Sequence, residues 1–143
     1  MLVTARAAYA CLAMLELAAR YGDPKPVRIA DVTDKHRIPQ RFLVQILLQF
    51  KGAGYVASSR GALGGYLLTM PPEEISLSDI MTAIDGPLPN QHDPVTSPRS
   101  PATLAICSVW NEVLAGERSL LQQATFAELV KRIKQPAGEM YYI

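Results

Sequence analysis

The chain has 143 residues, of which 49% are apolar and 19% are charged, with a formal net charge of +1. This length fits one compact domain with a modest appendage, and the composition excludes a disordered protein. No apolar run approaches the roughly 20 residues that span a bilayer, and no signal peptide with a cleavage site is evident. We therefore expect a cytoplasmic protein with no membrane partner.

The charges are distributed unevenly along the chain. Residues 1–70 carry nine Lys and Arg against four Asp and Glu, whereas residues 71–143 carry five against nine. A cationic half joined to an anionic half is typical of a nucleic-acid-binding module attached to a part that stays off the DNA.

The first predicted helix runs from an N-cap at Thr4 to about Arg20, before Gly22–Asp23–Pro24 interrupts it. Apolar residues cover most of its circumference, so we expect a central core helix with Glu16 and Arg20 as an exposed i,i+4 pair. Arg6, in the first turn, is a candidate phosphate contact together with the free backbone N–H groups. The alternative is that Arg6 is simply solvated.

Two more helices are predicted next, over Arg28–His36 and Pro39–Lys51, separated by a turn at Arg37–Ile38. Pro39 suits the first position of its helix. On a helical wheel this helix has a buried side, which consists of Phe42, Leu43, Ile46, Leu47 and Phe50.

The other side of the same helix combines polar and aliphatic residues, namely Arg41, Val44, Gln45 and Leu48. The major groove of DNA suits such a mixture, because arginine pairs with guanine, glutamine with adenine, and aliphatic groups contact thymine methyls. We predict that Arg41, Val44, Gln45 and Gln40 contact bases. The alternative is that the hairpin or a partner subunit covers Val44 and Leu48.

A β-hairpin is predicted directly after this helix. Two short apolar runs, 55–57 and 66–69, flank a tip with three glycines and Arg60, and glycine permits the positive φ angles of tight turns. A helix that precedes a short cationic hairpin predicts a winged helix-turn-helix, with Arg60 and Gly61 as the wing contact to DNA. The alternative is a surface hairpin whose arginine has no role.

The second half of the chain predicts three helices. Ser76 to Asp79 has capping-box spacing and begins one helix that continues through Ile84. Residues 86–101 contain five prolines and predict a loop. Ser100–Pro101 begins a long helix to about Gln122, and Thr125 begins the last one, through about Lys134.

Apolar residues cover roughly half the circumference of the long helix, which is generous for packing on one small domain. We therefore expect a homodimer contact through Ile106, Val109, Trp110, Val113, Leu114, Leu120 and Leu121. The predicted fold is mainly α with a small β-hairpin wing. It divides into a DNA-binding domain over residues 1–72 and a helical dimerisation and sensing region over residues 73–143.

The chain resembles the IscR/CymR-type family of bacterial winged helix-turn-helix transcription regulators. The most specific match is the wing, Arg60–Gly61–Ala62 followed by Gly64–Gly65–Tyr66–Leu67–Leu68. Shorter matches are Tyr9–Ala10, Met14–Leu15, Ala30–Asp31–Val32, Leu43 with Gln45, Gly54–Tyr55–Val56, Asp85–Gly86–Pro87, Trp110 and Tyr142–Ile143. The resemblance implies a homodimer whose long helices pack across the two-fold axis, with both winged helices on a palindromic operator.

Three departures from the family pattern affect function. Cluster-sensing members carry three cysteines in and around the loop 86–101, which here has none, so that only Cys107 lies nearby. Many members carry a glutamate directly before the glutamine of the recognition helix, where this chain has Val44. The operator sequence of those members therefore cannot be carried over. Many members also carry an arginine directly before the tyrosine of the first helix. This chain has Ala8 at that position and so lacks one phosphate contact.

Metal binding is disfavoured by the ligand inventory. An iron–sulfur cluster or a structural zinc needs three or four convergent ligands, whereas Cys11, Cys107, His36 and His92 fall in separate predicted elements. We expect no metal and no cofactor. Cys107 is a candidate redox-reactive thiol, although its apolar neighbours do not favour a thiolate. The chain shows no nucleophile–base pattern and no phosphate loop before a helix, so we do not expect an enzyme.

The sequence thus predicts a sequence-specific transcription regulator that binds double-stranded DNA as a homodimer, a repressor in preference to an activator. A winged-helix protein-interaction module without DNA binding is the competing hypothesis, and exposed Arg41, Gln45 and Arg60 on a cationic half favour DNA. The sequence leaves three candidates for the regulatory signal: a small molecule near the dimer helices, a redox event at Cys107, and a partner protein that binds the loop.

Overall fold

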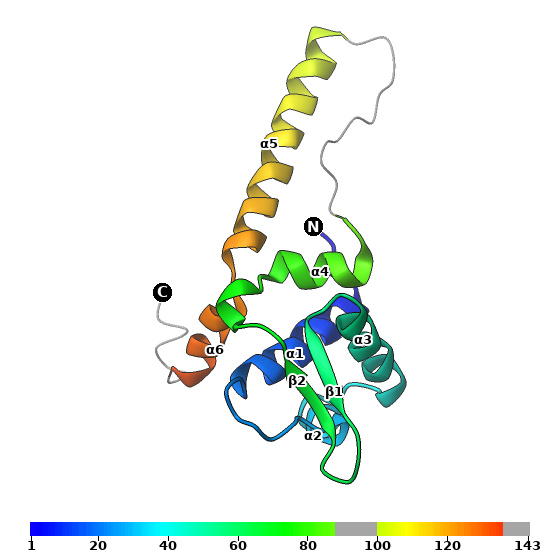
Figure 1. Cartoon of the computed structure of the whole chain (residues 1–143). Coiled ribbons are helices and arrows are strands. Elements are labelled where there is room, and N and C mark those ends of the chain that lie inside the picture. Colours follow the sequence, from blue (N-terminus) through cyan, green and yellow to red (C-terminus); the bar gives the residue numbers. More distant parts are fainter. Residues whose placement is uncertain (88–99, 136–143) are drawn as a thin grey trace.

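The computed structural model describes residues 1–87 and 100–135. Its elements in chain order are α1 (Ala5–Ala19), α2 (Ile29–His36), α3 (Gln40–Gly52), β1 (Val56–Ser59), β2 (Gly65–Leu68), the 3-10 helix η1 (Pro72–Glu74), α4 (Leu77–Asp85), α5 (Pro101–Gln123) and α6 (Phe126–Lys134). Helix α5 projects from the body, and the hairpin extends at the opposite end (Figure 1). The predicted mainly α fold with a small hairpin wing is confirmed. Most of the loop 86–101, with His92, and the residues from 136 onward lie outside the described residues.

Side-chain caps begin several helices where the sequence predicts them. The Thr4 hydroxyl accepts a hydrogen bond from the Ala7 N–H at 3.0 Å, and Ser76, Ser100 and Thr125 cap α4, α5 and α6 in the same way. Element bounds differ from the predicted ones by one or two residues. Pro39 is one such case, because it is the N-cap of α3 and the first helical residue is Gln40.

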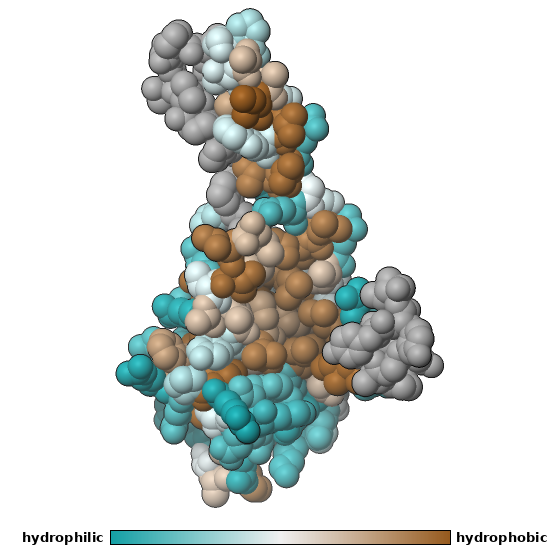
Figure 2. All heavy atoms as spheres, turned by 180° about the vertical axis from the view of Figure 1, so that it is seen from behind, coloured by the Kyte–Doolittle hydropathy of each residue, from teal (hydrophilic) through white to brown (hydrophobic). Residues whose placement is uncertain are grey.

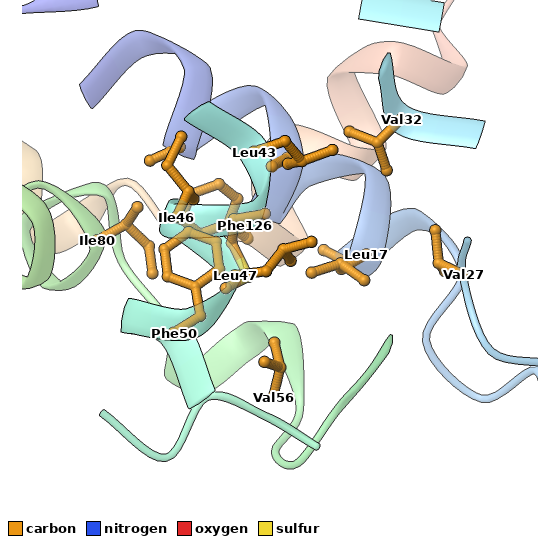
Figure 3. Packing of buried hydrophobic residues seen from close by; sticks show 14 of the residues in the cluster. Leu17, Val27, Val32, Leu43, Ile46, Leu47, Phe50, Val56, Ile80 and Phe126 are labelled. Carbon is orange, nitrogen blue, oxygen red and sulfur yellow. The ribbon is translucent and has the colours of Figure 1, made fainter. Parts of the chain in front are cut away.

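The hydrophobic core lies where α1, α3 and α4 pack together, with α6 beside α1. Figure 3 shows Leu43, Ile46, Leu47 and Phe50 of α3 converging with Leu17, Ile80 and Phe126 of the neighbouring helices. These four α3 residues are fully or almost fully buried, which confirms the predicted inner side of this helix. Each such side chain contributes about 1.5–3 kcal/mol relative to an exposed one. Phe42 is only half-buried.

Glu16 corrects one expectation, because its side chain is only 5% exposed and does not lie on the surface. The C-terminal end of α2 covers it. The carboxylate lies 3.0 Å from Arg20 Nη2, 3.1 Å from Lys35 Nζ and 3.1 Å from His36 Nε2. A wheel of α1 alone could not reveal this, since the covering residues come from another helix.

The ion cluster at Glu16 fixes α2 against the central helix. Burial by itself would raise the pKa of Glu16, but hydrogen bonds from His36, Lys35 and Arg20, with the charge of Lys35, lower that pKa below its usual value. The ionised carboxylate therefore stabilises the folded arrangement of α1 and α2.

The wing is an antiparallel hairpin in which Val56 pairs with Leu68 and Ser59 with Gly65. The segment before α2 adds a short third partner, since Val27 and Tyr66 exchange two backbone hydrogen bonds of 2.9 and 2.8 Å. Glycine is required at 65, because a Cβ there would lie 2.4 Å from the Val27 carbonyl oxygen. The hairpin is thereby joined directly to the helix-turn-helix.

Helix α5 leaves much of its apolar surface uncovered. Among the residues predicted for a subunit contact, Leu121 is buried within its own chain and Leu114 is half-buried. The other five are exposed, with Leu120 at 70% and Trp110 at 44%. Apolar side chains continue from α5 onto the body (Figure 2). None of the helices described here combines the length and the hydropathy of a membrane-spanning segment.

Candidate nucleic-acid interface

Helices α2 and α3 form the helix-turn-helix, and α3 presents its outer side to solvent. Arg37 adopts a left-handed conformation, with φ of 53°, and so reverses the chain between the two helices. On α3, Gln40, Arg41 and Gln45 are exposed, Leu48 is 58% exposed, and Val44 is half-buried. This side of α3 carries donors, acceptors and aliphatic groups together, as a helix in a major groove requires.

Arg41 is held by an aromatic neighbour. Its guanidinium carbon lies 5.0 Å from the centroid of the Phe42 ring, and that ring lies 6.0 Å from the ring of Tyr9 on α1. A cation–π contact at an exposed site contributes about 0.5–1 kcal/mol. A guanidinium over a ring face keeps outward N–H groups available for hydrogen bonds. The half-buried Phe42 therefore helps to orient Arg41.

Arg6, which the sequence suggests as a phosphate contact, is tied to α3. Its Nη2 donates a hydrogen bond to Gln49 Oε1 at 2.6 Å, and its buried Nε has no hydrogen-bond partner among the described residues. Sequence reasoning missed Gln49, although it follows Gln45 by one helical turn. The hydrogen bond between Arg6 and Gln49 joins α1 to α3 next to the exposed side of α3.

The wing tip carries Arg60, which is exposed in the five-residue loop between the strands. Gly61 has a φ of 103°, and its carbonyl accepts a hydrogen bond from the Gly64 N–H at 3.0 Å. A Cβ on Gly64 would lie 2.4 Å from the Ser59 carbonyl oxygen. The glycines therefore permit the tight turn that brings Arg60 to the surface.

Two cationic side chains that the sequence analysis did not single out hold the wing against the helices. Lys51 Nζ of α3 donates to Ser58 Oγ at 2.8 Å, and Arg28 Nη2 donates to the Ala62 carbonyl oxygen at 3.2 Å. We call Gln40, Arg41, Val44, Gln45, Arg60 and Gly61 the α3–wing surface. Gln40, Arg41, Val44 and Gln45 lie on α3, and Arg60 and Gly61 lie in the loop of the wing that follows α3, whereas Ile106 to Leu120 lie on the projecting α5 (Figure 1).

The described cysteines and histidine, Cys11, Cys107 and His36, are each candidate metal ligands by residue type. In the described residues, no three or more of the His, Cys, Asp and Glu side chains form a group that could hold a metal ion. Cys11 on α1 and Cys107 on α5 are both half-buried. Burial, and secondarily the charge of Asp85, raises the pKa of Cys11 to about 11, so this thiol is protonated at neutral pH.

Comparison with known proteins identifies the family. Residues 3–132 match the model of the family Rrf2, which is described as an iron-dependent transcriptional regulator. The chain belongs to the Rrf2 family. It is 37% identical over 131 residues to a Mycobacterium tuberculosis protein that is named as an HTH-type transcriptional regulator, covering 90% of this chain and 81% of that one.

Two solved structures share the fold. CymR, the global cysteine regulator of B. subtilis, superposes with a TM-score of 0.81 at 25% identity, over 92% of this chain and 98% of its own. IscR of T. potens gives a TM-score of 0.75 at 27% identity, over 99% of this chain and 97% of its own. The resemblance to IscR and CymR and the winged-helix architecture are confirmed. The family consists of DNA-binding transcription regulators and not of enzymes.

Proposed function

We propose that this Rrf2-family regulator is a homodimeric repressor that binds a palindromic operator through the α3–wing surface. The observation that carries the proposal is that Arg41 and Gln45 on α3 and Arg60 on the wing are all exposed. Two such surfaces related by a two-fold axis would read two half-sites. In this proposal, residues 1–72 bind DNA, and residues 73–143 dimerise and sense.

The apolar side of α5 supports dimerisation. Ile106, Val109 and Val113 are 50%, 56% and 56% exposed, values that are unusual for a sustained row of aliphatic side chains on a monomer. The N-terminal segment extends this side, since the Met1 amine lies 3.2 Å from Glu117 of α5 and Leu2 is 95% exposed. A second copy offers the same apolar side and would cover it in a symmetric interface.

Repression requires less of this chain than activation does. A dimer that occupies an operator blocks access to the promoter by its bulk alone, whereas an activator also needs a surface that binds the polymerase. The second half is anionic and its described exposed apolar residues are concentrated on α5. That half suits assembly and regulation better than contact with DNA.

We further propose that the regulator works without an iron–sulfur cluster, although the family is described as iron-dependent. Such a cluster needs about four thiolate or imidazole ligands. This sequence has two cysteines, on α1 and α5, and two histidines. The raised pKa of Cys11 disfavours its thiolate. The regulatory signal then has three candidate sources: a redox event at Cys107, a small molecule near α5, or a partner protein at the loop 86–101.

Selection of bound sequences from a random pool of double-stranded DNA tests the proposal. We expect enrichment of one motif with inverted half-sites, spaced by one helical turn or a multiple of it. The Arg41→Ala, Gln45→Ala double variant should lose this enrichment, while Lys131→Ala on α6, away from the α3–wing surface, should keep it. If the unaltered protein enriches no sequence, the winged-helix interaction module becomes the better explanation.

A further inference from the structure

Arg28 occupies the N-cap of α2, a position at which it costs the helix stability. The preferred N-cap residues are Ser, Thr, Asp and Asn, whose short side chains accept a hydrogen bond from the first turn. The Arg28 side chain makes no cap hydrogen bond, so the helix start relies on the other half of a capping box, in which the Arg28 backbone N–H donates to Asp31 Oδ2 at 3.2 Å. Its positive charge also lies at the positive end of the helix dipole. A residue that breaks a local preference in this way calls for a compensating contact elsewhere.

That contact is with the wing. Arg28 Nη2 donates to the carbonyl oxygen of Ala62, 34 residues later in the chain and two residues after Arg60. The β1–β2 ladder ends at the Ser59–Gly65 pair, so Ala62 lies in the loop beyond it. Arg28 and Ile29 also line one shallow hollow together with Ser58, Ser59 and the wing glycines. The side chain thus reaches past the ladder to the tip.

We propose that Arg28 is a positioning residue for the wing, which holds the Ala62 carbonyl and thereby fixes the loop that presents Arg60 to DNA. The inference rests on the proposed DNA-binding function. The Val27–Tyr66 bridge supports the strands, but the loop 60–64 lies beyond the ladder, and ordering a loop at the moment of binding reduces affinity. The Arg28–Ala62 hydrogen bond partly orders the wing loop in the free protein, so that less ordering is needed when DNA binds. It acts through Arg60 and not through a phosphate contact of its own.

Arg28→Ser separates this role from a general contribution to folding. Serine is a preferred N-cap residue, so the variant should melt at the same temperature as the unaltered protein or higher. Its affinity for the selected operator should nevertheless fall by about three- to tenfold, as expected for loss of one hydrogen bond that orders the wing. The matched control is Lys25→Ala, which removes an exposed cation from the same segment and should change affinity less than about twofold.

A double-mutant cycle with Arg60→Ala decides whether Arg28 acts through Arg60. In the Arg60→Ala background, Arg28→Ser should cause no further loss of affinity, and the salt dependence of binding should not change with residue 28. The inference is overturned if Arg28→Ser binds like the unaltered protein. It is also overturned if the two losses multiply and the salt slope falls by about one, as for a phosphate contact. Failure of the proposed function would show separately, as absence of any selected operator.

Discussion

The guanidinium of Arg6 on α1 and the side-chain oxygen of Gln49 on α3 are 2.6 Å apart, although 43 residues separate them in the chain. This hydrogen bond joins the central helix to the helix of the α3–wing surface. Arg6 is half-buried and thus contributes to the fold in addition to any contact with DNA.

We expect Arg6→Ala to lower the free energy of unfolding by about 1–2 kcal/mol, because it removes a charge-assisted hydrogen bond and leaves Gln49 Oε1 without its donor. Gln49→Ala should cost a similar amount, and the double variant should cost less than the sum. Urea unfolding measures these differences. If Arg6→Ala instead leaves stability unchanged and reduces the salt slope of DNA binding by about one, Arg6 is a phosphate contact alone.

Helix starts could be predicted from the sequence because their causes are local. Thr4, Ser76, Ser100 and Thr125 each accept a hydrogen bond from a residue three positions later. A Ser or Thr directly before a helical pattern indicates the cap, and at Ser76 and Thr125 the capping-box spacing adds to that signal. The inner side of α3 was predictable for a similar reason, since its period follows from the helix itself.

The contacts that shape the candidate site could not be predicted, because they join residues distant in the chain. Glu16 looks exposed on a wheel of α1 until Lys35 and His36 of α2 cover it. Likewise, nothing in the local pattern around Arg28 points to Ala62. Such pairings depend on the angles at which the helices pack, which the period of one helix does not determine.

Glu16→Gln should destabilise the protein in a pH-dependent manner. The pKa of Glu16 is lowered in the folded state, so its ionised form contributes stability above the unfolded pKa of about 4.3, and this contribution is lost as the pH falls through the folded pKa. We expect a loss of about 1–3 kcal/mol at pH 7 that shrinks toward pH 3. The control, Glu128→Gln, alters an exposed pair 3.8 Å from Lys131 and should cost less than about 0.5 kcal/mol.

Chemical unfolding between pH 3 and pH 7, followed by circular dichroism, measures the loss of stability in each of the two variants. An equal loss at pH 7 and pH 3 would show that Glu16 acts through packing and not through its charge.

Arg60→Ala should weaken binding to the selected operator by about 1–3 kcal/mol if Arg60 contacts a base, with relaxed specificity at one position of each half-site. If Arg60 contacts phosphate, the loss should be similar on all sequences and the salt slope should shrink by about one. Fluorescence anisotropy at several salt concentrations distinguishes the two. Unchanged affinity and unchanged slope would remove the wing from DNA recognition.

Val113→Asp tests the proposed subunit contact, because it puts a charge in the middle of the exposed apolar side of α5. A buried, unpaired charge costs several kcal/mol, so the variant should sediment as a monomer or fail to fold. Ser108→Asp is the matched control, since residue 108 is exposed on the opposite side of the helix and its variant should remain dimeric. If the unaltered protein is monomeric at micromolar concentration, operator binding needs another source of two-fold symmetry.

The final prediction concerns the signal. Because Cys11 is protonated at neutral pH, Cys107 is the one candidate ligand or redox-active thiol of each subunit, and a pair across a dimer would offer two. With so few thiolates a cluster would stay open to water. We therefore expect colourless protein after anaerobic purification and operator affinity that iron chelators leave unchanged. Brown protein with iron and acid-labile sulfide near one cluster per subunit would contradict this. If oxidants weaken DNA binding by the unaltered protein, Cys107→Ser should bind DNA normally and no longer respond, whereas Cys11→Ser should respond as before, because the raised pKa of Cys11 keeps its half-buried thiol protonated.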